Sequence, residues 1–204
     1  GKTTTTVNLA IALASQGKKV GLLDADIYGP NVPRMMGVVD THPEIVGQKV
    51  KPIVAYGVEM MSMGSLMESG QSLIWRGSMI MKAIEQLLRD ILWSDLDVLF
   101  IDMPPGTGDV PLTVYQSLPV DGIIVVTTPQ ELVSMIVEKA VNMAGLLSVP
   151  IIGIVENMSY FVCPNCNEKH YIFGKSKVEE EANKYGIKHT ATLPINPSLA
   201  QKCD

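Results

Sequence analysis

The sequence predicts an α/β fold built on a doubly wound, mainly parallel sheet. Short apolar runs alternate along the chain with segments of helical pattern, and each run is nearly continuous in its apolar character. Continuous apolar runs are typical of strands buried on both faces, and strands that alternate with helices indicate parallel pairing. Ligands of such sheets bind beyond the carboxyl ends of the strands. The predicted strands are residues 19–24, 97–102, 122–127 and 151–156.

Helical patterns fill the intervals between these strands. Residues 4–16 end at Gly17, which is a favourable C-terminal cap. Residues 78–92 place apolar side chains on one stripe and charged ones largely on another. Residues 131–147 and 175–185 are the other predicted helices.

Two inserts depart from the alternation of strand and helix. Residues 50–63 are predicted as a hairpin or a pair of extended segments, and residues 159–173 as a hairpin. The first insert contains Met60, Met61 and Met63. We interpret these methionines as core residues, an adaptable surface for client proteins being the alternative.

The composition fits one folded domain over residues 1–204, with 18% charged and 47% hydrophobic residues. The formal net charge of −5 gives no general electrostatic reason to bind nucleic acid. No apolar run approaches the roughly 18 residues of a membrane-spanning helix. Three cysteines, two of them close together, argue against a disulfide framework and for a reducing compartment. We therefore expect a cytoplasmic protein with no nucleic-acid or membrane partner.

The first three residues match the end of a phosphate-binding loop. In that pattern the lysine reaches the β- and γ-phosphates and the threonine hydroxyl binds Mg²⁺, roles that would fall to Lys2 and Thr3 after Gly1. The helix predicted directly afterwards would present its N-terminus to the phosphates. Because the tripeptide alone occurs by chance in many proteins, an ordinary loop with a helix cap is the alternative.

Carboxylates at the ends of two predicted strands support the phosphate-loop interpretation. Asp102 ends an apolar strand in the form of a Walker B aspartate that serves Mg²⁺. Residues 104–109 (PPGTGD) follow, and their glycines let backbone amides approach a phosphate closely. Asp24 and Asp26 end another strand at the same edge of the sheet. One of them can serve the Mg²⁺ shell while the other orients a water for attack on the γ-phosphate; a polar strand end is the alternative.

A Cys-Pro-Asn-Cys pair, Cys163 and Cys166, lies inside the second insert. Pro164 fixes φ and Asn165 tolerates a left-handed turn, so both thiolates can face one metal. A redox pair, a structural disulfide and a chance pair are the alternatives. His170 could complete a mononuclear site, but we expect it to be peripheral.

A four-thiolate site needs two more sulfurs than this pair provides. The remaining cysteine, Cys203, lies far along the chain and is assigned no role. In a twofold-symmetric dimer the same patch meets itself, so two copies of Cys163 and Cys166 would complete the site. Such a site accepts Zn²⁺ or an iron–sulfur cluster.

Several sequence blocks together resemble one family. The chain is similar to the Mrp/ApbC (NBP-type) iron–sulfur cluster carriers, which belong to the deviant-Walker-A class of P-loop ATPases with MinD, ParA and the nitrogenase iron protein. The similarity runs in register from Gly1 to about Asp204. It implies a strand and a signature lysine before Gly1 and a helix after Asp204. The blocks are residues 1–4 (GKTT), 24–30 (DADIYGP), 75–77 (WRG), 102–109 (DMPPGTGD) and 156–159 (ENMS).

The resemblance implies a role for individual residues of the nucleotide site. Asp26 would be the switch I residue that positions water, and Asp102 the Walker B residue. Asn157 would recognise the adenine ring, with Pro194 and Ile195 bordering the base; a simple turn residue is the alternative for Asn157. The other implied nucleotide contacts are Gly1, Lys2, Thr3, Thr4, Asp24 and Gly106.

The implied function is that of a homodimeric ATPase that carries iron–sulfur clusters. It would hydrolyse ATP with Lys2, Asp26 and Asp102 as catalytic residues. It would hold a bridging 4Fe-4S cluster at Cys163 and Cys166 and transfer the cluster to apo-proteins. Three alternatives stay open: a MinD/ParA-type positioning ATPase, an electron-transfer ATPase like the nitrogenase iron protein, and a dimer held by structural Zn²⁺ at the same sulfurs.

Overall fold

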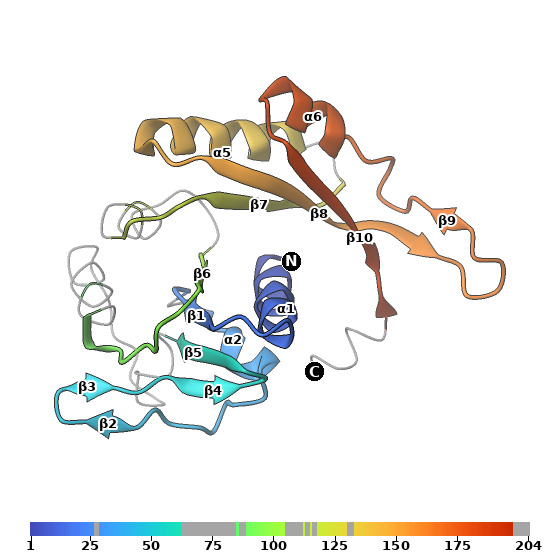
Figure 1. Ribbon diagram of the computed structural model, residues 1–204. Coiled ribbons are helices and arrows are strands. Elements are labelled where there is room, and N and C mark those ends of the chain that lie inside the picture. Colours follow the sequence, from blue (N-terminus) through green and yellow to red (C-terminus); the bar gives the residue numbers. More distant parts are fainter. Residues whose placement is uncertain are drawn as a thin grey trace. The chain divides into compact units, whose positions relative to one another are not determined.

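The computed structural model divides into two compact units, Lys2–Ser117 and Leu118–Asp204, with Gly1 grouped with the second (Figure 1). Each unit has its own sheet and its own cluster of buried apolar side chains. The structure describes residues 1–26, 29–62, 85, 89–104, 112, 115, 118–129 and 133–197.

The main sheet of the first unit has the strand order β4-β5-β1-β6. β1 (Val20–Asp24) pairs in parallel with β5 (Val58–Ser62) and with β6 (Val98–Asp102), whereas β4 (Ile53–Ala55) runs antiparallel to β5. Every residue of β1 is buried, as the continuous apolar run predicts for a central strand. The other elements of this unit are α1 (Lys2–Ser15), α2 (Val32–Met35), β2 (Ile45–Val46) and β3 (Lys49–Val50).

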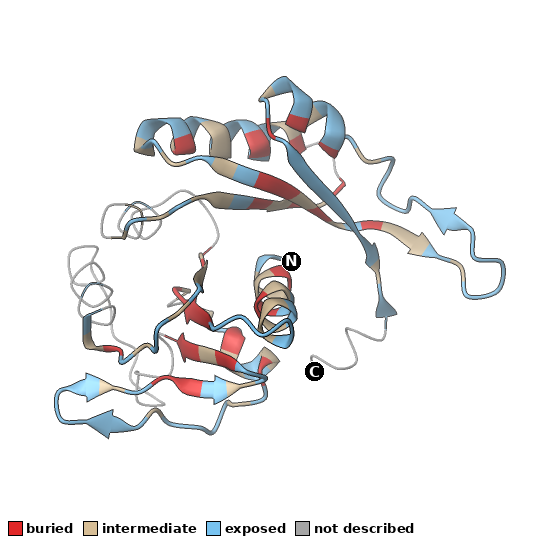
Figure 2. Cartoon of the chain, viewed as in Figure 1, coloured by how far each residue is buried: buried red, intermediate tan, exposed pale blue. Residues whose placement is uncertain are grey.

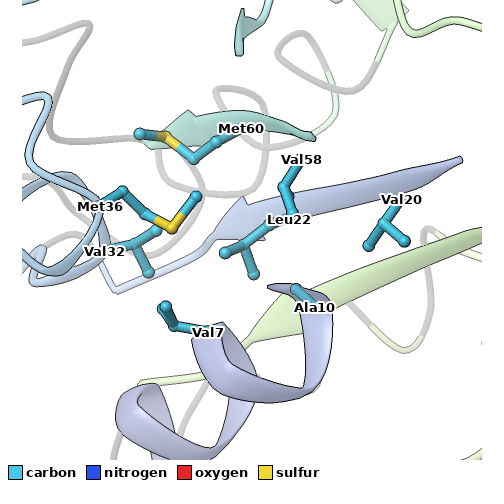
Figure 3. Close-up of a cluster of buried hydrophobic side chains, with 8 residues drawn as sticks. All are labelled: Val7, Ala10, Val20, Leu22, Val32, Met36, Val58 and Met60. Carbon is cyan, nitrogen blue, oxygen red and sulfur yellow. The ribbon is translucent and has the colours of Figure 1, made fainter. Parts of the chain in front are cut away.

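Apolar side chains of α1 pack toward β1 to form the core of the first unit. Val7 and Ala10 extend from α1 toward Leu22 of β1, and Met36 and Met60 belong to the same cluster (Figure 3). None of these five side chains is more than 3% exposed. Their burial fixes α1 beside the strands whose ends carry the predicted carboxylates.

The first insert forms the predicted hairpin. β4 and β5 are joined at Tyr56 and Gly57, whose φ angles of 51° and 76° are the left-handed values of a tight hairpin turn. Met60 and Met61 are fully buried on β5, which confirms their interpretation as core residues. Met63 lies outside the described residues.

The main sheet of the second unit has the strand order β10-β8-β7, with parallel pairing throughout. β8 (Ile151–Val162) lies between β7 (Ile123–Thr127) and β10 (His189–Ile195). α5 (Val133–Leu147) and α6 (Val178–Lys184) lie over one face of this sheet, as Figure 1 shows.

The core of the second unit lies between these two helices and the sheet. Val133 and Val137 of α5 and Val178 of α6 are buried together with Val125 of β7 and Ile154 of β8. Figure 2 colours buried positions red on these helices and strands. The period of these positions on α5 is that of an amphipathic helix with one face on a sheet. No helix within the described ranges is long and apolar enough to cross a membrane.

The predicted strands are present, and one is longer than predicted. The sequence predicts its end at Glu156, whereas β8 continues to Val162. Met158 has a φ of 59°, and beyond it the strand pairs with Pro194 and Ile195 of β10 after a shift in register. These partners keep β8 hydrogen-bonded past the polar residues that indicate its end.

Three of the four predicted helices agree with the structure except near their ends. α1 begins at Lys2 rather than at residue 4, and α6 is shorter than the predicted residues 175–185. α5 matches its prediction closely. The helix predicted over residues 78–92 falls largely outside the described residues.

Gly153 lies where β8 and β10 approach too closely for a side chain. A Cβ at this position would lie 2.8 Å from the carbonyl oxygen of His189, which is backbone and has no rotamer to move to. We expect Gly153→Ala to lower the free energy of unfolding by roughly 1–3 kcal/mol. Urea denaturation measures this loss. Gly145→Ala on α5, where a Cβ meets nothing within 4 Å, is the control, and equal stability of the two variants would contradict the expectation.

Candidate functional site

A threonine ties the start of α1 to the end of β6. The Thr6 hydroxyl lies 3.0 Å from Oδ1 of Asp102 and 3.1 Å from the carbonyl oxygen of Lys2. Thr3 stands one turn earlier on the same face of the helix and also hydrogen-bonds to Asp102. Lys2, Thr3 and Asp102, for which the sequence predicts a joint role, are therefore neighbours in the structure.

Two buried aspartates stand side by side at one edge of the sheet. Asp24 on β1 and Asp102 on β6 are partners in the parallel register, and they are 0% and 2% exposed. Ser62 at the end of β5 is in register with Asp24 and donates a hydrogen bond to its Oδ2 at 3.1 Å. The amide of Asp26 donates to Oδ1 of Asp24 at 3.1 Å. The strand ends thus meet as the parallel sheet predicts.

Burial shapes the ionisation of both carboxyl groups. Burial raises the pKa of Asp24 to about 6, and the negative charge of Asp102 adds to the rise. Hydrogen bonds from a backbone amide and from the Ser62 hydroxyl lower this pKa, but by less than burial raises it. Burial also raises the pKa of Asp102. Hydrogen bonds from the two threonines of α1 and the positive charge of Lys2 lower it, but by less. Paired carboxylates and a threonine hydroxyl are hard oxygen donors whose burial favours a bound cation, so this donor set fits Mg²⁺.

Asp26 lies just past the end of β1 and is partly buried. Its Oδ1 accepts a hydrogen bond from the Gly29 amide at 3.2 Å, which fixes the direction of the carboxylate. Its charge contributes to the raised pKa of Asp102, so the two carboxylates interact. Asp26 therefore belongs to the same group of residues as Lys2 and Thr3.

The structure describes two of the other three predicted phosphate contacts, Thr4 and Gly1. Thr4 lies on the first turn of α1, where its carbonyl oxygen accepts a hydrogen bond from Nδ2 of Asn8 at 2.8 Å. Gly1 is exposed directly before α1. Gly106 lies outside the described residues, so its role stays a prediction.

Thr6 and Ser62 are two residues of this site for which no role is predicted from the sequence. Thr6 could have been found from its spacing, because a residue three positions after Thr3 shares its helix face. Ser62 ends β5 level with Asp24, but this needs the strand register, which the apolar pattern does not contain. The polar ends of three adjacent strands together form the site.

The predicted adenine-binding residues lie in the second unit. Oδ1 of Asn157 accepts a hydrogen bond from the Met158 amide at 2.9 Å, so the side chain supports the bend at that residue. Pro194 and Ile195 pair with β8 a few residues further on. The three residues thus share one region of the second sheet, and adenine recognition by them stays a prediction.

A buried carboxyl precedes Asn157. Glu156 is fully buried, and its Oε2 accepts a hydrogen bond from the Ser159 hydroxyl at 2.6 Å. The contact spans Asn157 and Met158 and closes the bend between them. No individual role is predicted for Glu156 from the sequence, because a carboxyl at a strand end carries no signal of its own.

The cysteine pair lies in the turn of a hairpin made by the end of β8 and β9 (Lys169–His170). Cys163 donates its amide to the carbonyl oxygen of Glu168 and accepts the Asn167 amide, both at 2.9 Å. Asn167 has the left-handed φ of 59°. The left-handed turn expected at Asn165 is therefore two residues later, because the turn closes between Cys163 and Glu168.

Both cysteines of this turn are free thiols, Cys163 partly buried and Cys166 exposed. Hydrogen bonds from the amides of Cys166 and Asn165 lower the pKa of the Cys163 thiol. A lowered thiol pKa favours the thiolate, which is the form that binds metals. Cys203 lies outside the described residues.

His170 is not peripheral, and that expectation is wrong. One ligand atom each from Cys163, Cys166 and His170 lie within 4.8 Å of one another. The antiparallel register explains this, because Phe161 is the partner of His170 and the Cys163 amide bonds Glu168. His170 is therefore the diagonal, same-face neighbour of Cys163 across the hairpin. The sequence predicts His170 as a possible ligand, but only the strand pairing places it beside the cysteines.

The fold and the first-unit site place this protein among the P-loop nucleoside triphosphatases, with an α/β fold and a mainly parallel sheet. The chain belongs to the family described as ParA, NUBPL iron-transfer P-loop NTPase, whose model matches residues 1–204. This agrees with the family resemblance and the fold class that the sequence predicts.

Relatives from bacteria and archaea match this sequence over almost its whole length. The iron–sulfur cluster carrier protein of Helicobacter pylori is 52% identical over 201 residues, covering 98% of this chain and 55% of the relative. The iron–sulfur cluster carrier protein of Methanocaldococcus jannaschii is 48% identical over 207 residues, covering 100% of this chain and 71% of the relative. The chain thus spans about half of the first relative's length.

Two solved structures have folds similar to that of this chain. The nucleotide-binding protein of Archaeoglobus fulgidus, solved in complex with ADP and with cobalt found in it, has a TM-score of 0.88 at 41% identity, over 99% of this chain and 79% of that one. The septum site-determining protein MinD of Pyrococcus horikoshii, solved with Mg-ADP, has a TM-score of 0.69 at 19% identity, over 100% and 79%. The second likeness concerns the fold alone.

Proposed function

We propose that this protein is a nucleotide-dependent carrier of iron–sulfur clusters. It binds and hydrolyses ATP, holds a 4Fe-4S cluster between two copies of the chain through Cys163 and Cys166, and transfers that cluster to apo-proteins. The observation that carries the proposal is the pair of free thiols in an exposed hairpin turn, on a chain whose first unit gathers phosphate-loop residues and strand-end carboxylates.

The first-unit residues supply the nucleotide chemistry. Lys2 neutralises charge on the β- and γ-phosphates, and the start of α1 directs backbone amides toward them. Thr3 and Asp102 are the residues that would hold Mg²⁺, with Asp24 beside them. Bound Mg²⁺ would supply charge neutralisation at the β- and γ-phosphate oxygens. Asp26 orients the attacking water, because its carboxylate is fixed by the Gly29 amide and lies near Asp102.

The family resemblance supports a role in adenine recognition for Asn157, Pro194 and Ile195. The carboxamide of Asn157 matches the donor and acceptor edge of adenine, and Pro194 and Ile195 offer apolar surface to the ring. The bend at Met158 and the buried Glu156 contact position the Asn157 side chain. ADP bound to the 41% identical Archaeoglobus fulgidus protein supports an adenine nucleotide as the ligand.

The cluster is the cargo, and two copies of the chain are needed to hold it. A 4Fe-4S cluster takes four thiolates, and the described residues of one chain offer two. A twofold axis through the hairpin turn brings Cys163 and Cys166 of both copies together. The iron–sulfur cluster carrier proteins of Helicobacter pylori and Methanocaldococcus jannaschii support this cargo. The partners are then a second copy and apo-proteins that lack their cluster, in the cytoplasm.

Anaerobic reconstitution with iron and sulfide tests the cargo assignment. The expected product is a dimer with about two irons per chain and a broad visible absorption band. The Cys163→Ser/Cys166→Ser variant is expected to lose the band and the iron, whereas Cys203→Ser, the matched control, retains both. A double variant that still binds the full cluster would disprove the site.

Cluster transfer and metal identity are measured on the same material. An apo-enzyme whose activity requires a 4Fe-4S cluster should regain activity when mixed with the loaded dimer in the presence of a chelator for free iron. Metal analysis of protein purified without oxygen separates this function from the zinc alternative. Zinc alone at the four sulfurs, with no capacity for iron, would contradict the proposal.

A further inference from the structure

We propose that one chain by itself binds a mononuclear, borderline-soft divalent ion such as Zn²⁺ through Cys163, Cys166 and His170, leaving one coordination position open. The site shares Cys163 and Cys166 with the proposed cluster but adds His170 and needs one chain, so a chain holds either the mononuclear ion or its share of the cluster. It does not depend on the proposed function, since it needs neither a second copy nor a nucleotide. It lies wholly within the second unit.

The donor atoms suit such an ion in type and in number. Two thiolates and one imidazole are the ligands that Zn²⁺ and Co²⁺ bind well in proteins. Among the described residues, these three form the group of three or more His, Cys, Asp or Glu side chains whose ligand atoms lie close enough together to hold a metal ion. Three protein ligands with a fourth position left to water or another ligand is the arrangement of an open zinc site, in contrast to the closed four-ligand structural sites.

The spacing of the donors is close to what the ion requires. Their ligand atoms lie within 4.8 Å of one another. Ligand atoms of a tetrahedral zinc site are separated by roughly 3.5–3.8 Å, given the Zn–S and Zn–N bond lengths. Rotation about side-chain bonds closes this difference of about 1 Å without a change in the backbone. The exposed side chains of Cys166 and His170 are free of the packing that would oppose it.

The hairpin backbone holds the ligands in one place. The Cys163 amide and the Glu168 carbonyl oxygen close the turn, and the Asn167 amide bonds the Cys163 carbonyl oxygen. This backbone ring contains Cys166. The pairing of Phe161 with His170, in the hairpin of β8 and β9 (Figure 1), then sets the histidine on the same face as Cys163.

The opposite face of the hairpin is braced by aromatic side chains. The rings of Tyr160 and Tyr171 lie 6.4 Å apart, and Nζ of Lys169 lies 4.3 Å from the Tyr160 ring centre. Lys169 alternates with His170 along β9, so its positive charge is on the face away from the three ligands. Two thiolates and an imidazole therefore balance the ion's double charge, and Lys169 points away from them.

Cobalt is the probe, because thiolate-bound Co²⁺ has charge-transfer absorption in the near ultraviolet and tetrahedral Co²⁺ has strong visible bands. The reduced protein is titrated with Co²⁺ without oxygen, iron or nucleotide. The expected result is one cobalt per chain with both sets of bands, and monomeric protein by sedimentation. Added Zn²⁺ should displace the cobalt and abolish the colour.

Variants of the histidine decide the assignment. His170→Ala is expected to weaken cobalt binding by roughly tenfold or more, since loss of an outer-shell partner alone costs about 10–100-fold in known sites. His170→Cys should restore tight binding with stronger charge-transfer absorption, because the site then has three thiolates. His189→Ala, which removes an exposed histidine of β10 outside the group, should bind like the unmodified protein.

Two outcomes would overturn the proposal. One is a His170→Ala variant with the affinity and spectrum of the unmodified protein. The other is one cobalt per two chains regardless of residue 170, the result expected of four thiolates shared by two copies. Cluster reconstitution of His170→Ala separates this inference from the proposed function, because the shared cluster is expected to survive the loss of the histidine.

Discussion

An Asp26→Asn variant is expected to bind ATP about as tightly as the unmodified protein and to lose turnover by roughly 10²–10⁴-fold. Asparagine keeps the oxygen that accepts the Gly29 amide at 3.2 Å, so the loop after β1 should retain its conformation. It replaces the other carboxylate oxygen with an amide and removes the negative charge. The site would then lack the acceptor that orients water for attack on the γ-phosphate.

Binding and turnover must be measured separately on this variant. A fluorescent ATP analogue titrated in the presence of Mg²⁺ gives the affinity, and phosphate release under saturating ATP gives the turnover. Asp40→Asn, which removes an exposed carboxylate from the same unit, is the matched control and should leave both values unchanged. Unchanged turnover in Asp26→Asn, or a loss of affinity equal to the loss of turnover, would refute the assigned role.

The second expected effect concerns stability and its dependence on pH. Asp24→Asn should stabilise the nucleotide-free protein in the presence of EDTA, relative to the unmodified protein, as the pH rises from about 4 to about 7.5. Asp24 is fully buried, and burial raises its pKa from 3.8 to about 6. The ionised carboxylate is thus a cost to the folded state, which asparagine avoids while still accepting the hydrogen bond from the Asp26 amide.

The sign of this effect follows from proton binding. Between pH 3.8 and about 6 the folded state binds the Asp24 proton more tightly than the unfolded state, so the free energy of unfolding falls as pH rises through that window. The whole shift corresponds to up to about 3 kcal/mol, at about 1.4 kcal/mol for each pKa unit. Below the window the carboxyl is protonated in both states and the cost is absent.

Urea unfolding at several pH values measures the difference between the variant and the unmodified protein. The difference should grow in favour of Asp24→Asn with rising pH, whereas Asp40→Asn should show no such trend. Mg²⁺ with nucleotide should then stabilise the unmodified protein more than the variant, since the ionised carboxylate gains a cation nearby. A difference independent of pH would contradict the expected cost of the buried charge.

The sequence correctly predicts most of the features that depend on the order of residues within one segment. The continuous apolar runs correctly place β1, β6 and β7, and the carboxylates Asp24 and Asp102 do end adjacent parallel strands. These predictions succeed because burial on both faces and the alternation of strand and helix leave a direct record in residue order. The interpretation of Met60 and Met61 as core residues is also correct, because β5 is buried beside β1.

Strand register leaves no such record, and it decides the remaining features. Ser62 reaches Asp24 only because β5 and β1 are level at their ends. His170 reaches the cysteines only because β9 returns beside β8 with Phe161 as its partner. The length of β8 likewise depends on Pro194 and Ile195, far away along the chain. Each of these contacts is set by pairing between segments, which single-residue patterns do not contain.

The register of the β8–β9 hairpin also constrains how this region can change in evolution. Side chains alternate between the two faces of a strand, so one residue added to or removed from the turn between Cys163 and Glu168 would exchange the faces of everything on β9. His170 would then share a face with Tyr160, and Lys169 would face the thiols. The length of the turn is therefore constrained as tightly as the identity of Cys163 and Cys166.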